Sequence, residues 1–138
     1  MLSPSPSAAP RPIHPLHAAA LGGVLPLYLC TLLADYAYWV TYQIQWSNFA
    51  SWLLVAAMVM TSLALLAAMI GQVRGSRRLF YTLVLALMWG LGFSNSLQHA
   101  RDGWGIMPGA LWISALLCVL ALLATWLGFA SLRHGGVR

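Results

Sequence analysis

The chain has 138 residues but no lysine and no glutamate, and its only acids are Asp35 and Asp102. Charged residues make up 7% of it, against about a quarter in a typical soluble domain, so they are too few to cover a surface exposed to water. Hydrophobic residues make up 61%, and most of the surface is therefore expected to face lipid. The arginines give a net charge of +5, but they form no basic stripe with interleaved aromatics, which argues against a nucleic-acid partner.

Catalytic and metal-binding motifs are also missing. The two cysteines, Cys30 and Cys118, lie in apolar runs that place them at different depths, and no CxxC or zinc spacing is present. There is no glycine-rich phosphate loop, no HExxH or GxSxG motif, and no glutamate to act as a general base. The sequence therefore predicts a protein that is not itself an enzyme and has no metal site.

Four hydrophobic stretches are long enough to cross a bilayer, whose hydrocarbon core of roughly 30 Å needs about 20 apolar residues. They cover about residues 17–41, 48–71, 79–98 and 106–132. Short polar links separate them, and none shows the strict alternation of a barrel strand. We therefore expect an all-α fold, an integral membrane bundle of four transmembrane helices that forms one domain over residues 13–138. Residues 1–12, rich in Pro, Ser and Ala, are expected to be a disordered cytoplasmic tail.

The arginines set the predicted orientation. Six of them precede the first stretch, separate the second from the third, or follow the fourth: Arg11, Arg74, Arg77, Arg78, Arg133 and Arg138. Only Arg101 falls on the opposite side. Because positively charged loops stay in the cytoplasm, both termini and the link containing Arg74, Arg77 and Arg78 are predicted to be cytoplasmic.

Polar groups gather at the predicted periplasmic end of helices 17–41 and 79–98. At 1.5 Å per residue, Asp35 lies about 27 Å beyond His17 and His99 about 30 Å beyond Leu79, so the two groups share a level. A spacing of i, i+3, i+4 and i+7 places polar or aromatic side chains of each helix on one face. The candidate ligand-binding site comprises Asp35, Tyr38, Trp39, Tyr42, Asn95, Gln98 and His99.

Two interpretations of this site stay open. In the functional one, the site is a shallow pocket that opens to the periplasm. Asp35 and His99 accept protons there, and aromatic walls hold a quinone headgroup, whose redox reactions move protons with electrons. In the structural one, Asp35 only fastens the bundle by hydrogen bonds between helices. Both predict that Asp35 is buried and hydrogen-bonded against helix 48–71 or helix 79–98.

A haem cofactor is disfavoured by the depth of the histidines. Haem b in a four-helix membrane cytochrome needs two histidines at one depth on facing helices, whereas His14 and His17 lie about 30 Å from His99. His14 and His17 are therefore only second-choice cofactor ligands. Their expected role is to anchor the start of the first helix at the lipid headgroups.

Several stretches resemble a known family. RPIHPLH (Arg11–His17), the run LLADYAYWVTYQIQWSNFASWLL, and the later FSNSLQHARDGW and TWLGFASLRHGG are similar to the bacterial membrane family called domain of unknown function 2231. The chain departs from the family's opening His-Pro repeat at Arg11, where a first histidine is common. The resemblance implies a bacterial inner-membrane location. It also implies a redox association, because family members often look to be encoded beside periplasmic quinoprotein sugar dehydrogenases.

Taken together, the sequence favours a non-catalytic accessory or anchor subunit of the inner membrane. Its periplasmic face would dock a periplasmic quinoprotein dehydrogenase or other redox subunit and position quinone nearby. The alternatives are a purely structural bundle that assists assembly of a larger membrane complex, a haem b electron-transfer protein, and a small transporter or channel. The last is weakened because the sequence shows no polar line through the bilayer.

Overall fold

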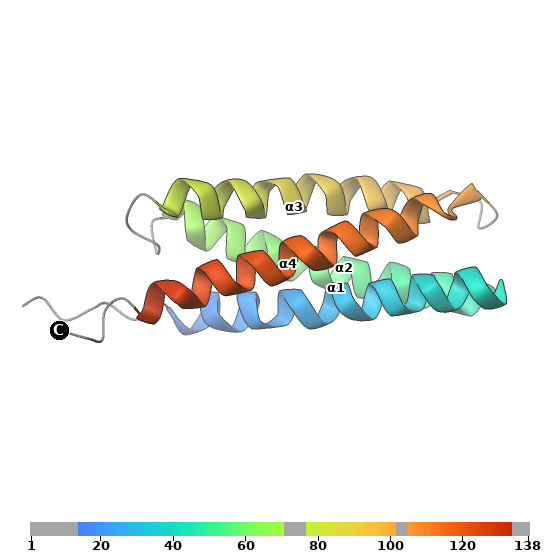
Figure 1. The fold of residues 1–138 in the computed structure, drawn as a ribbon, viewed down its shortest axis with the longest axis horizontal. Coiled ribbons are helices and arrows are strands. Elements are labelled where there is room, and N and C mark those ends of the chain that lie inside the picture. The colour runs from blue at the N-terminus through green and yellow to red at the C-terminus, as the bar shows by residue number, and fades with distance from the viewer. Residues whose placement is uncertain (1–13, 71–76, 102–104, 134–138) are drawn as a thin grey trace, which may run out of the picture.

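The computed structural model describes residues 14–70, 77–101 and 105–133. Four α-helices run up and down one long axis (Figure 1): α1 (Pro15–Thr41), α2 (Ile44–Ile70), α3 (Arg77–His99) and α4 (Gly109–Arg133). All four are long and apolar enough to cross a membrane. The predicted all-α bundle of four transmembrane helices is confirmed. Residues 1–13, and with them the whole of the expected tail (residues 1–12), lie outside the described residues.

The two ends of the bundle are distinguished by the buried polar residue of α1 that lies nearer to each. The His17 end is where α1 and α3 begin and where α2 and α4 finish, and the Asp35 end is the opposite one (Figure 1). The start of α1 and the finish of α4 therefore lie on the same side, as an even number of spans requires. That this side faces the cytoplasm stays a prediction.

The helix boundaries correct two of the expected spans. The second helix begins at Ile44 and not near residue 48, because Tyr42 adopts a left-handed conformation (φ 53°) that ends α1 abruptly. The backbone N–H of Tyr42 still reaches the carbonyl of Tyr38, and Trp46 N–H already bonds Gln43. The fourth helix begins at Gly109 and not at residue 106, with Pro108, which has no N–H to contribute, directly before it.

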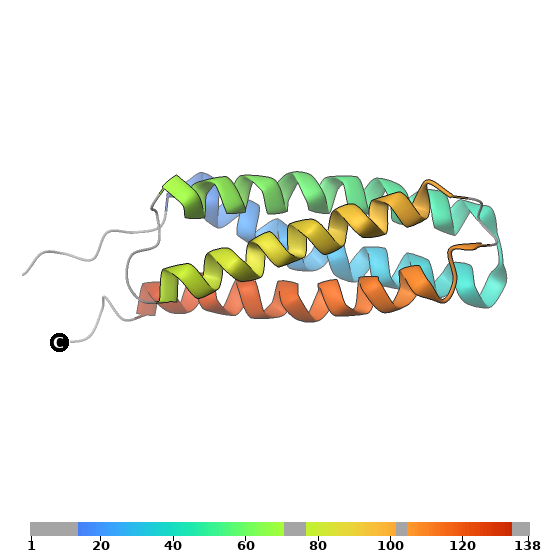
Figure 2. The ribbon, with the colours of Figure 1, turned by 90° about the horizontal axis from the view of Figure 1, so that it is seen from above.

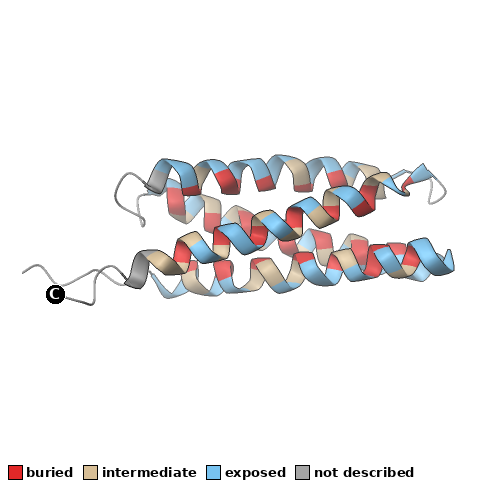
Figure 3. Ribbon diagram, in the orientation of Figure 1, coloured by how far each residue is buried: buried red, intermediate tan, exposed pale blue. Residues whose placement is uncertain are grey.

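The helices pack as a square (Figures 1 and 2). α1 lies against α2 and α4, and α3 lies against the same two helices from the other side, so α1 and α3 are diagonal neighbours. Small residues such as Ala57, Ala64 and Ala121 are fully buried where helices meet, which allows the backbones to approach closely. Buried positions form stripes on the inner faces (Figure 3). Large apolar side chains such as Trp52 and Trp126 are more than two-thirds exposed, as expected of a surface in lipid.

Candidate functional site

Asp35 is the centre of a hydrogen-bond network near the Asp35 end. Its carboxylate is fully buried. Nε2 of His99 on α3 lies 2.8 Å from Oδ1, and the hydroxyl of Ser114 on α4 donates to Oδ2 over 2.5 Å. Asn95, one turn before His99, donates from Nδ2 to the Ser114 oxygen over 2.8 Å. The network therefore joins three helices through four buried side chains, and the prediction that Asp35 is buried and hydrogen-bonded is confirmed.

Local helix geometry brings these groups together. Asn95 and His99 are one turn apart, so both side chains leave the same face of α3. Nδ1 of His99 lies 3.0 Å from the backbone carbonyl oxygen of Asn95, which fixes the orientation of the ring. Because α1 and α3 are parallel diagonal neighbours, Asp35 and His99 meet across the axis of the bundle. Ser114 approaches from α4, which packs against both helices.

The ring of His99 faces a hydrogen-bond acceptor at each nitrogen. The carbonyl of Asn95 can only accept, so Nδ1 must carry a proton. One more proton then lies between Nε2 of His99 and Oδ1 of Asp35. It makes either an imidazolium beside a carboxylate or a neutral imidazole beside a carboxylic acid. Both forms have zero net charge, which suits a site enclosed at membrane depth. The pair can thus hold one proton that shifts between a nitrogen and an oxygen.

The other predicted site residues are divided between the interior and the surface. Tyr38 is buried, and its neighbours include Ile106 and Ala110. Trp39 and Tyr42, by contrast, are exposed at 40% and 58%, and so lie outside the network. Gln98 is half-buried, with its amide beside Gly109 at the start of α4. The structure therefore joins Asp35, Asn95 and His99 in one network, while the ring of Tyr42 lies edge-on against that of Tyr38.

Ser114 is the member of the network that sequence reasoning missed. It lies in an apolar stretch of α4 whose next serine or threonine is Thr125, and serines inside helices often bond to their own backbone. One oxygen of the network also stands out, because Oδ1 of Asn95 is buried without a hydrogen-bond partner among the described residues. The enclosed site would thus accept one more hydrogen bond.

A second buried polar pair lies at the His17 end. The ring of His17 is packed inside the bundle and only 2% exposed, whereas the anchoring interpretation expects it on the surface at the start of the first helix. Its Nε2 is 2.8 Å from the hydroxyl of Tyr81 on α3, whose side chain is also buried. His14 is exposed and caps α1, where its Nδ1 accepts the N–H of Leu16. The two second-choice cofactor ligands therefore have separate structural contacts.

The depth of the two sites bears on any shared cofactor. His17 and Asp35 are 18 residues apart on α1, which is about 27 Å along the helix. His17 and His99 therefore cannot ligate one iron. Within the parts of the chain that the structure describes, no three His, Cys, Asp or Glu side chains gather as a metal site. Of the three arginines in the link between the second and third hydrophobic stretches, Arg77 and Arg78 open α3, and Arg74 lies outside the described residues, as does Asp102.

These features define a class of protein, a four-helix membrane bundle with a carboxylate–imidazole pair buried near one end. The family comparison is specific. Residues 13–138 match the family model described as a predicted membrane protein, DUF2231, and the chain belongs to that family. The family resemblance drawn from the sequence is thus confirmed. No curated protein and no solved structure matches the chain.

Proposed function

We propose that this protein is a non-catalytic inner-membrane subunit whose Asp35 end faces the periplasm and exchanges a proton for a partner oxidoreductase. The Asp35–His99 pair is the observation that carries the proposal. It holds one proton in a neutral unit, and it lies within about two turns of the last residue of α1, Thr41. A partner seated on this end would have a proton acceptor and donor close to its electron-transfer route.

The quinone part of the proposal depends on access. Reduction of a quinone takes up protons with electrons, and an imidazole–carboxylate pair can supply one of them and recover it from the water side. The unpartnered Oδ1 of Asn95 would accept a hydrogen bond from a quinol hydroxyl. Because the network is enclosed, a quinone headgroup would reach it only if the ends of α1, α3 and α4 moved apart.

A structural role has its own support. Asp35 is fully satisfied by His99 and Ser114, and these contacts tie α1 to both α3 and α4. A bundle that only assists the assembly of a larger membrane complex would need only these contacts between helices. The two candidate functions predict different effects of removing the Asp35–His99 pair. If the pair only holds the helices together, its loss lowers the amount of folded protein. If the pair exchanges protons, its loss lowers the activity per folded molecule.

The test uses the bacterium that makes the protein, with the gene deleted and then restored as wild type, D35N or H99Q. Membranes are assayed for quinone reduction driven by periplasmic sugar dehydrogenases, and the protein is quantified in the same membranes. The proposal expects normal abundance with at least about tenfold lower quinone reduction, which corresponds to ~1.4 kcal/mol in an activation barrier.

The matched control is T61A, which removes a buried hydrogen bond to Tyr28 in the middle of the bundle, away from the site. It should lower stability and leave activity per folded molecule unchanged. If D35N and H99Q behave as T61A does, the structural role stands and the proton-exchange function is wrong. An absorption spectrum and a lipid extract of the purified protein report in parallel whether haem, quinone or neither accompanies it.

A further inference from the structure

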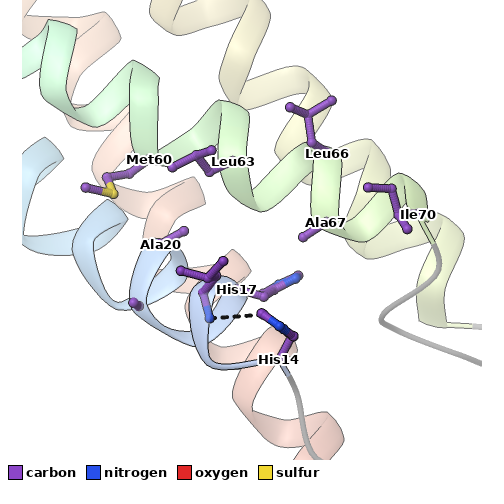
Figure 4. Close-up of a pocket in the computed structure, with 10 residues that line it drawn as sticks. His14, His17, Ala20, Met60, Leu63, Leu66, Ala67 and Ile70 are labelled. Carbon is purple, nitrogen blue, oxygen red and sulfur yellow. Dashed lines mark hydrogen bonds between the residues drawn. The ribbon is translucent and has the colours of Figure 1, made fainter.

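A groove runs between α1 and α2 at the His17 end (Figure 4). It encloses about 480 Å³ and is lined along α2 from Met60 to Ile70. Leu63, Leu66 and Ile70 on that wall are at least half exposed, so the groove opens sideways toward the surrounding lipid. Ten residues of helix span about 15 Å, which is half the hydrocarbon thickness of a bilayer. The groove thus has the length of one acyl chain within one leaflet.

The α1 side of the groove ends on two imidazoles. His14 and His17 line it, and the remainder of the lining is aliphatic apart from the thioether of Met60. His17 is held from behind by its bond to Tyr81, while its Nδ1 is buried without a hydrogen-bond partner among the described residues. A molecule in this groove would therefore have an apolar body and a polar head beside the histidines.

The His17 end is positively charged. Of the chain's two acids, Asp35 lies at the other end of the bundle, and Asp102 comes three positions after His99, the last residue of α3, in the sequence. α3 begins at Arg77 and α4 finishes at Arg133, both at the His17 end. In the sequence, Arg11 precedes His14 by three residues and Arg74 follows Ile70 by four. A head with negative charge is therefore favoured over a neutral or cationic one.

We propose that this groove binds an anionic phospholipid, with its phosphate at His14 and His17 and one acyl chain along Leu63 and Met60. Basic sites between transmembrane helices are a recurrent way to bind such headgroups. Topology alone would account for the arginines. It does not account for a leaflet-long groove that ends on a buried imidazole whose Nδ1 has no hydrogen-bond partner in the part of the chain that the structure describes. The site is independent of the Asp35–His99 pair and of the function proposed for it.

The experiment fills the groove and measures lipid retention by the full-length protein. Wild type and A19F are placed in nanodiscs of phosphatidylcholine with a minor share of phosphatidylglycerol, released into detergent, and weighed with their bound lipid by native mass spectrometry. Ala19 lines the groove. A37F is the matched control, because Ala37 lies 18 residues further on α1, five turns away on the same face and at the other end.

Wild type and A37F should retain phosphatidylglycerol over phosphatidylcholine by at least about tenfold, equivalent to ~1.4 kcal/mol, and A19F should lose this preference. H14N keeps a residue that can cap α1 but removes the imidazole, and it should weaken retention as well. Should A19F fail to fold, A67F on the opposite wall tests the same groove. Equal retention of both lipids by wild type, or equal effects of A19F and A37F, would overturn the proposal. Displacement of the lipid by inorganic phosphate would identify a free-phosphate site instead.

Discussion

His17 and Asp35 lie on the same face of α1, 18 residues and about five turns apart. Each bonds the residue 64 positions later in the chain, His17 to Tyr81 and Asp35 to His99. α1 and α3 are thus joined across the diagonal at both ends in the same register. Three fully buried apolar residues, Leu21, Val24 and Leu85, belong to the core between the two pairs. No polar contact links the pairs among the described residues, so a proton at the Asp35 end is expected to exchange with that side alone.

The bond between His17 and Tyr81 is expected to stabilise the bundle without serving the Asp35 end. Y81F removes the hydroxyl and leaves Nε2 of His17 without its partner. Hydrogen bonds between transmembrane helices contribute about 0.6 kcal/mol on average, with a maximum of about 1.7 kcal/mol. The melting temperature of Y81F in detergent should fall by a few degrees. An unchanged melting temperature would mean that the diagonal bond at the His17 end contributes nothing.

Ser114 should be the most sensitive serine of the chain's described residues. S114A removes a donor to Asp35 and the acceptor of Asn95 Nδ2, so two buried polar atoms lose partners, at about 1–3 kcal/mol each. The control is S51A, because the Ser51 hydroxyl bonds only the carbonyl of Ser47 in its own helix. Thermal unfolding should show a large loss for S114A and a small one for S51A. Similar losses for the two variants would contradict the network.

Two glycines of α3 should respond differently to alanine. A Cβ at Gly92 would lie 2.9 Å from the hydroxyl of Tyr28 and closer still to Met58, whereas a Cβ at Gly90 would meet nothing within 4 Å. G92A is therefore expected to destabilise the packing of α3 on α1 and α2. G90A should be neutral or stabilising, since alanine favours helix by up to about 1 kcal/mol over glycine. Equal melting temperatures of G92A and G90A would contradict the close approach of Gly92 to Tyr28 and Met58.

The predicted orientation of the protein in the membrane can be tested independently of the two polar sites. Reporter fusions after Arg138 and within the link 72–78 should both report the cytoplasm, because six of seven arginines fall on that side. A periplasmic signal from either fusion would place the Asp35 end in the cytoplasm, and the proposed docking of a periplasmic partner there would be wrong.

Hydrophobic length was enough to predict four spans, because the thickness of a bilayer sets the length of apolar helix that crosses it. Helix starts were less predictable. Gln45 and Trp46 suit a loop or an interfacial helix equally well, and only the left-handed turn at Tyr42 decides that α2 begins at Ile44. Depth and helical phase also brought Asp35, Asn95 and His99 to one level and one side.

The missed contacts depend on which helices are neighbours. Ser114 faces Asp35 because α4 packs on α1, and a serine in an apolar stretch of helix gives no sign of which helix it will face. The pairing of His17 with Tyr81 needs the diagonal arrangement of α1 and α3, which hydrophobic periodicity does not specify. Trp39 and Tyr42 share a helical face with Asp35 in the sequence, yet both are exposed, because helical phase does not specify how far neighbouring helices cover the last turn of α1.

Exchange of the shared proton with solvent is the most direct test of the central claim. In nanodiscs, ¹H–¹⁵N NMR should show a strongly downfield signal from the proton between Asp35 and His99, absent in H99Q, together with a protonated Nδ1 of His99. After transfer to D₂O, a proton-exchanging pair should lose this signal far sooner than the backbone amides at the middle of α1 lose theirs. A signal that persists as long as those amides, or an Nδ1 without a proton, would contradict the account and leave the pair as a structural fastening.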